Sequence, residues 1–453
     1  MVKPTSPLIA PPSPGQSAPW REPQLEPEAA GGVVSEDEND ESAWLLKFCV
    51  AYGFIMLVFL NYAAVLPLVQ REWGLTNSAA GMIFSAYQFG YIFSATILSY
   101  LTDRFKARRI FLISAVWSVV ANFLFALFAV DLTSALVYRA LAGLGMGGTY
   151  MPGLKLVADR FPSERRGRAV GYFTSAFVFG AAASTLLSGL VGSVAGWRFA
   201  IFTSAAGTLV GTLLCLAILQ EDRGVARQDA GRQLRLEVVR NRPALLLILA
   251  YAAHMWEQYG MRAWMAAFLA ASFVHIGYSK GEATGYGATL TAIIVAVGGF
   301  ATGLAGVLSD RLGRTRTATA IMVLSAGCSL GFGWLMGLSP VVLVLAGVAY
   351  SFFVVAESPV LSTGLTELVP SRCVGAAMGL QTLVGFVAAT ASPAVFGWVL
   401  DVSNPARTGA QGGMPLVWGW AFGVLGVGAL IGPLALAIAR RLPTSTKMAG
   451  GKG

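Results

Sequence analysis

The sequence predicts an all-α polytopic membrane protein with twelve transmembrane helices in two six-helix halves. Three observations support this fold class: long apolar runs recur along the whole chain, Lys and Arg concentrate in alternate loops, and one charged loop sequence occurs twice. Of the 453 residues, 55% are hydrophobic and 12% are charged. Soluble domains carry about 25% charged residues, so a soluble protein of this length would need far more polar surface.

Twelve apolar runs are long enough to cross a membrane, because a hydrocarbon core of about 30 Å takes about 20 residues of helix. The runs are continuous rather than alternating in polarity, which excludes a transmembrane barrel. The seventh run has the length for a kink. The expected segments are 45–69, 77–101, 109–130, 133–157, 168–193, 197–219, 243–274, 284–308, 317–337, 339–366, 374–400 and 415–440.

These segments divide the chain into five parts. Residues 1–43 are rich in Pro, Ser, Gly and acidic residues and contain no long apolar stretch. We therefore expect a disordered cytoplasmic tail there, solvated rather than regulatory, and neither a signal peptide nor a span. The other parts are an N-terminal half at 44–219, a basic cytoplasmic linker at 220–242, a C-terminal half at 243–441 and a cytoplasmic tail at 442–453.

The distribution of Lys and Arg predicts the orientation. The loops after the even-numbered segments carry 18 of these residues, and the loops after the odd-numbered segments carry only 4, namely Arg71, Arg198, Lys280 and Arg407. Loops rich in Lys and Arg remain in the cytoplasm. We therefore expect both termini to be cytoplasmic and the location to be a cell membrane, typically a bacterial inner membrane. The net charge of +9 is then a topology signal and not a nucleic-acid surface.

The composition indicates no metal, cofactor or nucleotide. The four cysteines are far apart, form no C-x-x-C and lie in or beside apolar segments, where we expect small buried side chains. No G-x-x-x-x-G-K-[ST] motif is present, so ATP hydrolysis is not expected. The expected partners are a small-molecule substrate, protons and the lipid bilayer, and we expect a monomer.

A charged loop sequence marks an internal repeat. "SYLTDRFKARR" (99–109) follows the second segment, and "GVLSDRLGRTR" (306–316) follows the eighth. Asp103-Arg104 and Asp310-Arg311 are 207 residues apart, a separation of six segments. Two six-helix halves joined by a basic loop are typical of a duplicated transporter.

These loops resemble the signature of the major facilitator superfamily, G-x-x-x-D-R-x-G-R-R between helices 2 and 3 and again between helices 8 and 9. "ADRFPSERRGRAVG" (158–171) and "GWR" (196–198) are also similar to loops of that family, and the resemblance covers about residues 44–441. The second signature has Gly306, Asp310, Arg311, Gly313 and Arg314. The first departs from it at Ser99, Lys106 and Ala107 but keeps Asp103, Arg104, Arg108 and Arg109.

The resemblance implies alternating access and a cytoplasmic latch at these loops. A carboxylate beside guanidinium groups forms strong charge-assisted pairs, which can exist in one conformation and break in another. The alternative is a topology anchor without a gating role. The latch is favoured for Asp103, and the two readings are equally supported for Asp310.

The fourth segment contains "RALAGLGMGG" (139–148), which matches G-x-G-x-x-G. No strand precedes it, so a nucleotide site is not expected, and the small residues predict close helix packing instead. Arg139 lies one to two turns inside the outer end of this segment, where a charge is costly. Its position also resembles the family's helix-4 pattern, which implies substrate contact or proton coupling. The alternative is an arginine that reaches the membrane surface.

The seventh segment carries an unusual polar face. His254, Gln258 and Arg262 are spaced at i, i+4 and i+8 and share one side of a helix, with Glu257 on its flank. Ionisable groups in a spanning helix favour a lining of a polar cavity. An internal pair of Glu257 with His254 or Arg262 is the alternative. His254 is also a residue type that titrates near neutral pH.

Glu357, in the tenth segment before Pro359, is a candidate proton carrier, because burial favours the neutral form of a carboxyl group. A pair of Glu357 with Arg262 or Arg139 is the alternative. Weaker candidates are neutral polar residues at plausible depths, namely Asn61, Tyr62, Tyr87, Gln88 and Gln381.

The predicted function is secondary active transport. Two arginines can bind a carboxylate through paired hydrogen bonds, so we expect a small organic anion that is imported together with protons by alternating access. The alternative is efflux of a drug or metabolite in exchange for protons, which is disfavoured because the fifth segment lacks a Gly-Pro pair. An enzyme is not expected, since no convergent nucleophile and base are present, and a transport-dead receptor has little support.

Overall fold

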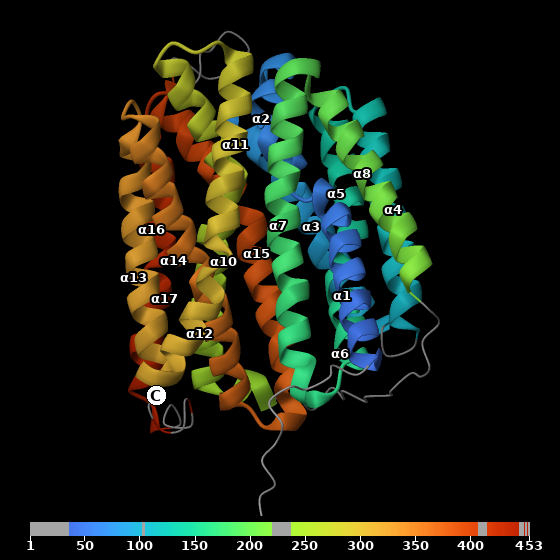
Figure 1. The fold of residues 1–453 in the computed structure, drawn as a ribbon. Helices are drawn as coiled ribbons and strands as arrows, with labels where there is room; N and C mark the ends of the chain where they lie inside the picture. Colours follow the sequence, from blue (N-terminus) through green and yellow to red (C-terminus); the bar gives the residue numbers. More distant parts are fainter. Residues whose placement is uncertain are drawn as a thin grey trace, which may run out of the picture. The chain divides into compact units, whose positions relative to one another are not determined.

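The computed structural model describes residues 36–101, 105–219, 237–405 and 415–443, together with Met448 and Gly451. The chain divides into two compact units, Met1–Ser42 and Ala43–Gly453. In the first unit the described part is the start of helix α1 (Glu36–Ile55). The second unit is a bundle of helices (Figure 1), and no strand occurs among the described residues.

Each of the six predicted segments of the N-terminal half is helical, which confirms the fold class. The first segment combines α1, η1 (Met56–Val58) and α2 (Asn61–Trp73), and the fourth combines α5 (Leu132–Gly147) and α6 (Tyr150–Arg160). The others are single helices: α3 (Asn77–Leu101), α4 (Ala107–Phe128), α7 (Ser163–Ala195) and α8 (Trp197–Ile218).

The C-terminal half follows the same plan. The seventh segment, which has the length for a kink, is one unbroken helix, α10 (Arg242–His275). The eighth is divided at Gly299 into α11 (Lys280–Gly298) and α12 (Ala301–Leu312). The rest are α13 (Arg314–Phe332) with η2 (Gly333–Leu335), α14 (Pro340–Leu368), η3 (Ser371–Cys373) with α15 (Val374–Ser403), and α16 (Gly419–Ala429) with α17 (Ile431–Arg440).

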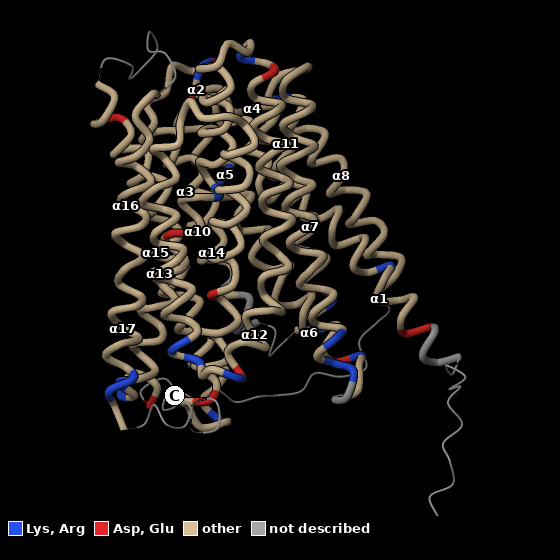
Figure 2. The backbone as a smooth tube through the Cα atoms, turned by 60° about the vertical axis from the view of Figure 1, so that its left-hand side comes forward, with Lys and Arg blue, Asp and Glu red and all other residues tan. Residues whose placement is uncertain are grey.

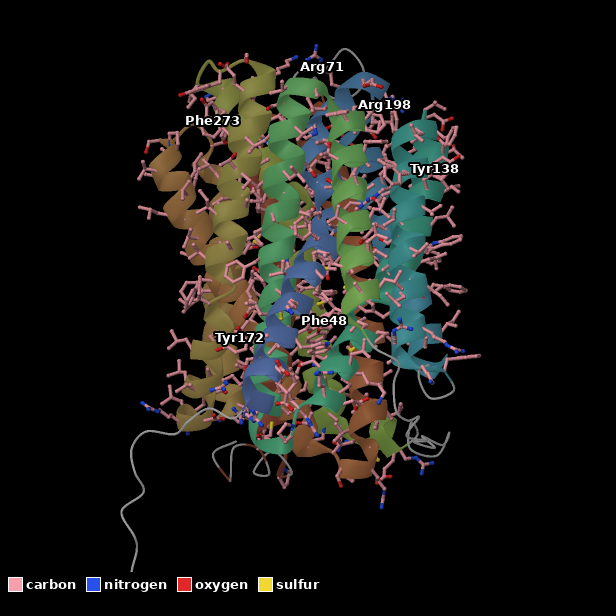
Figure 3. The ribbon with its side chains drawn as sticks, turned by 45° about the vertical axis from the view of Figure 1, so that its right-hand side comes forward. Phe48, Arg71, Tyr138, Tyr172, Arg198 and Phe273 are labelled. Atoms are coloured by element: carbon pink, nitrogen blue, oxygen red, sulfur yellow. The ribbon has the colours of Figure 1, made fainter. Side chains whose placement is uncertain are left out.

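The bundle has the polarity of a membrane protein. Within the described ranges, nine helical stretches are long and apolar enough to cross a membrane. The other three predicted segments correspond to α3, α5 with α6, and α10. Charged residues lie mostly at the two ends of the bundle (Figure 2). We call the end that carries Arg160, Arg311, Arg372 and Arg440 the basic end. Arg71 and Arg198 lie at the opposite end (Figure 3).

The two halves contact each other mainly through α3 with α15 and α7 with α11, and less extensively through α2 with α10 and α11. The backbones approach closely where glycine removes the side chain: a Cβ on Gly81 would lie 2.2 Å from the carbonyl oxygen of Pro393. At the opposite end, the Asp401 carboxylate of α15 accepts hydrogen bonds from the backbone N–H groups of Asn77 and Ser78, at 2.9 and 2.8 Å. The side chains of Asn77 and Ser78 also donate to it, both at 2.8 Å.

The glycines of the fourth segment form a close helix contact, as the sequence predicts. A Cβ on Gly143 would lie 2.0 Å from the carbonyl oxygen of Tyr87, and one on Gly90 would lie 2.0 Å from that of Ala140. A Cβ on Gly145 would lie 2.6 Å from the backbone nitrogen of Ser118. Helix α5 is therefore held directly against α3 and α4, with Arg139 one turn before the tightest contact.

We expect the Gly143→Ala variant to be less stable than the wild type by about 1–3 kcal/mol, because the added methyl group forces α3 and α5 apart. Gly331→Ala is the matched control, since a Cβ on this helical glycine meets no atom within 4 Å. The control should be neutral or more stable by up to about 1 kcal/mol. Thermal unfolding of the full chain in detergent measures both, and equal melting of the two variants would contradict the close contact.

Candidate functional site

Arg139 lies inside the N-terminal half, seven residues into α5, or about 10 Å from the start of the helix at about 1.5 Å per residue. Its side chain is completely buried and does not reach the surface. The guanidinium stacks 4.4 Å from the ring of Tyr87, and its Nη1 donates to Oδ1 of Asn61 at 3.2 Å. Its Nε and Nη2 have no partner among the described residues.

Neighbouring amides fix the orientation of Asn61. Its Nδ2 donates to Oδ1 of Asn122 at 3.2 Å, and the Nδ2 of Asn122 donates to the carbonyl oxygen of Ser118 at 2.8 Å. The amide oxygen of Asn61 is thereby directed at Arg139. Tyr62 is committed elsewhere, because its hydroxyl donates to the carbonyl oxygen of Ala80 at 3.0 Å.

Further polar groups on α3 are buried without partners. The hydroxyl of Tyr87 and both amide atoms of Gln88 have none among the described residues. Buried polar groups are almost always satisfied by protein, water or ligand. Tyr87 lies against the guanidinium of Arg139, whose unpartnered N–H groups match a ligand with several acceptor oxygens.

The C-terminal half holds both buried glutamates in one cluster. Nδ1 of His254 lies 2.9 Å from Oε2 of Glu357. The Ser325 hydroxyl is within hydrogen-bond reach of Oε1 of Glu357, and it lies 3.0 Å from Oε2 of Glu257. The side chains of His254, Glu257, Ser325 and Glu357 are fully buried. Glu357 therefore pairs with His254. The alternatives that the sequence left open, a pair with Arg262 or with Arg139, are not found.

Arg262 is also buried, with 6% of its surface exposed. Its guanidinium lies 5.7 Å from the ring centre of Tyr259, and its Nε has no partner among the described residues. Gln258 is buried on the same helix, and Nε2 of Gln381 is another unpartnered donor. Within the described part of the chain, neither Arg139 nor Arg262 forms an ion pair with a carboxylate.

Aromatic rings connect the two halves near these residues. Phe386 of α15 stacks on Tyr91 of α3, with ring centres 4.4 Å apart, and lies 5.4 Å from Tyr259 of α10. Tyr91 is one turn from Tyr87 and Gln88 on α3. Phe386 thereby connects Tyr259, the ring beside Arg262, to α3, which also packs against the helix of Arg139.

The repeated loop forms a network within the C-terminal half. Nη1 of Arg314 contacts Oδ1 of Asp310 at 2.5 Å, and its Nη2 contacts Oε1 of Glu367 at 2.8 Å. Gly313 has φ +99° at the turn from α12 to α13, a conformation that favours glycine. Arg311 is exposed on α12.

The first copy of the loop is only partly described. Nε of Arg108 donates to the carbonyl oxygen of Leu219 at 2.7 Å, at the end of α8. Asp103 and Arg104 lie outside the described residues. At the same basic end, Arg372 donates to Glu237 at 3.0 Å, and this hydrogen bond lowers the pKa of the Glu237 carboxyl.

Sequence reasoning missed Ser325, Asn122 and Tyr259. All three lie in predicted segments, but a serine, asparagine or tyrosine in an apolar helix is too common to be singled out without knowing which face points inward. The close spacing of His254, Glu257, Gln258 and Arg262 was the stronger signal, and the structure buries all four.

The family model of the Major Facilitator Superfamily matches residues 48–393. The chain belongs to the major facilitator superfamily. It is therefore a multi-pass membrane transport protein and not an enzyme, and the resemblance of its loops to this family is confirmed.

Curated members of this superfamily resemble the chain over most of its length. It is 26% identical to a probable sulfoacetate transporter of Cupriavidus necator, over 84% of this chain and 90% of that protein. It is 26% identical to a cis,cis-muconate transport protein of Acinetobacter baylyi, over 85% of this chain and 93% of that protein.

A solved structure shows the same fold. A bacterial homologue of the human lysosomal transporter Spinster, in an inward-facing and unoccupied conformation, aligns with a TM-score of 0.71 and 16% identity. The alignment covers 91% of this chain and 98% of that one.

We expect Arg139→Met and Arg262→Met to be as stable as the wild type or more stable, by up to about 4 kcal/mol, because each arginine is desolvated without an acidic partner. Arg314→Met is the matched control and should lose about 1–2 kcal/mol with its hydrogen bonds to Asp310 and Glu367. Melting of the purified variants measures this. A large loss of stability for Arg139→Met would indicate a structural role instead.

Proposed function

We propose that this protein imports a small organic anion together with protons by alternating access. The observation that carries the proposal is the separation of buried charges. Glu257 and Glu357 both contact the hydroxyl of Ser325, and Glu357 also contacts His254. Arg139 and Arg262, in contrast, have no carboxylate partner among the described residues.

A buried guanidinium without a counter-ion favours an anionic ligand. Taking such a charge out of water costs several kcal/mol unless it is paired, and a bound carboxylate or sulfonate supplies the missing negative charge. The planar guanidinium matches two oxygens of one such group. The free donors of Arg139, Gln88 and Tyr87 are thus suited to an acid headgroup, and Arg262 to a second polar or acidic group.

The relatives support an anion rather than a lipophilic compound. The two described above carry the names of sulfoacetate and cis,cis-muconate, which are a small sulfonate acid and a small dicarboxylate. A charged, donor-rich site also fits poorly with a purely apolar drug, so efflux of such a compound is the less supported alternative.

The halves at 44–219 and 243–441 would be the bodies that move, with the basic end in the cytoplasm of a bacterial cell. Both termini are then cytoplasmic. We further propose that Asp103 and Arg104 contribute to a latch at this end. For Asp310, the ion-pair partner Arg314 lies in its own half and also binds Glu367 of that half, which favours the anchoring role over the latch.

Purified protein in liposomes should take up labelled short-chain carboxylates or sulfonates in a saturable manner, and uptake should rise when the external medium is made more acidic. A panel of mono- and dicarboxylates, sulfoacetate and cationic dyes measures this. Failure of every anion together with dye export would overturn the proposal in favour of efflux.

Arg139→Ala and Arg262→Ala should each lower anion uptake by at least about tenfold, since a charge-assisted hydrogen bond contributes about 1.5–3 kcal/mol. Arg139→Lys keeps the charge but loses the planar pair of donors, so it should recover uptake only in part. Initial rates at equal protein content test this. Wild-type rates in both alanine variants would exclude the arginines from the substrate site.

A further inference from the structure

The buried acidic cluster contains a hydroxyl group with more acceptors than it has protons. Ser325 Oγ lies 3.0 Å from Oε2 of Glu257 and 3.2 Å from the carbonyl oxygen of Met322, and it contacts Oε1 of Glu357. A serine hydroxyl has one proton to donate and two lone pairs that accept. A backbone carbonyl and an ionised carboxylate can only accept.

Counting protons shows which charge states fit this geometry. If both glutamates were ionised, Ser325 could donate to one of the three neighbouring oxygens, and two contacts would be between lone pairs. If one glutamate carries a proton, that carboxyl donates to Ser325, and Ser325 donates to the other carboxylate. Both carboxylate contacts are then satisfied without an additional cation, and only the longer contact with the Met322 carbonyl at 3.2 Å has no proton.

We propose that Glu257 and Glu357 form a single proton-binding site bridged by Ser325, and that this site carries the proton of the transport cycle. This inference rests on the proposed function for its role in coupling. The site lies wholly in the C-terminal half, on α10, α13 and α14, and it is separate from Arg139 in the N-terminal half.

The bridge also provides a path for the proton. Glu257 gives its proton to a lone pair of Ser325, while Ser325 passes its own proton to Glu357. One O–H bond breaks and one forms at the serine, so the hydroxyl is regenerated and only the carboxylates exchange charge. In the tautomer of His254 that carries its proton on Nδ1, the ring donates to Oε2 of Glu357 and stabilises the ionised form of that carboxylate.

Both ends of this chain are open. Oε1 of Glu257 and Nε2 of His254 have no hydrogen-bond partner among the described residues. Oε1 of Glu257 can therefore receive or release a proton. Nε2 of His254 can take up a proton while Nδ1 gives its own proton to Oε2 of Glu357, so that one N–H bond forms and one breaks at the imidazole.

Few other titratable groups face the cluster. Arg262 and Tyr251 lie on α10, and the Tyr251 ring centre is 5.5 Å from that of His254. Cys328 lies on α13, and Tyr350 on α14 contacts the hydroxyl of Ser329. Helix α16 (Gly419–Ala429) carries no titratable residue. The described charged residues of α11, α15 and α17 lie at helix ends: Lys280, Glu282, Asp401 and Arg440.

Infrared spectra of the full-length protein in liposomes test the site without any substrate. At neutral pH, the wild type should show the C=O stretching band of one protonated carboxyl group. This band should persist through the pH range in which carboxyl groups ordinarily lose their protons. The band should be lost in Glu257→Gln and in the double variant with Glu357→Gln. Absence of the band in the wild type, or its persistence in the double variant, would overturn the shared proton.

Serine variants give a test that preserves the charges and the fold. Ser325→Ala removes the bridge and should shift the carboxyl band. Ser272→Ala, a buried serine farther along α10, removes a hydroxyl that donates to the carbonyl oxygen of Phe268 and should leave the band unchanged. An unshifted band in Ser325→Ala would overturn the bridging role.

Transport then tests coupling. With an anion identified by wild-type uptake, Glu257→Gln should lose accumulation driven by a pH gradient but keep exchange of labelled for unlabelled anion at equal pH. Retained pH-driven accumulation, or loss of exchange as well, would contradict the coupling role. If no anion is transported by the wild type, the proposed function fails, while the infrared result still decides whether the shared proton exists.

Discussion

A charge buried inside a membrane protein must find a partner, and the arrangement of partners organises this molecule. In the described structure, two glutamates, a histidine and a serine satisfy one another in the C-terminal half. Arg139 and Arg262 are left with an amide and aromatic rings. Rings and amides compensate only part of the desolvation of a guanidinium, and this is the physical basis of our proposal that these arginines bind an anion.

The glycine contact between α3 and α5 makes this arrangement possible. Without side chains at Gly90 and Gly143, the two backbones touch, and Arg139 is placed over the ring of Tyr87. A larger residue would separate the helices and move the guanidinium away from both Tyr87 and Asn61. The G-x-G-x-x-G motif within residues 139–148 therefore serves helix packing, and this packing also fixes the position of the Arg139 charge.

The sequence could predict the helices because apolar runs, basic loops and the repeated Asp-Arg are properties of single segments. It could also single out Arg139, His254, Glu257, Arg262 and Glu357, because an ionisable residue is conspicuous against an apolar background. It could not predict that Glu357 pairs with His254 rather than with an arginine. That choice depends on the rotation and relative height of α10, α13 and α14. Ser325, which contacts both glutamates, looks in the sequence like any other serine in an apolar helix.

The contacts between the halves have a consequence for alternating access. At the end opposite the basic loops, Asp401 of the C-terminal half binds the first two residues of α3 in the N-terminal half through four hydrogen bonds. Two of the donors are backbone N–H groups at the start of a helix, where a negative charge is favoured. Opening this end must break these bonds and separate the glycine contact at Gly81 and Pro393. The same helix, α3, carries Tyr87, whose ring lies against Arg139. A movement of α3 that releases Asp401 would also move this ring, and under the proposed function it would link anion binding at Arg139 to the contact at Asp401.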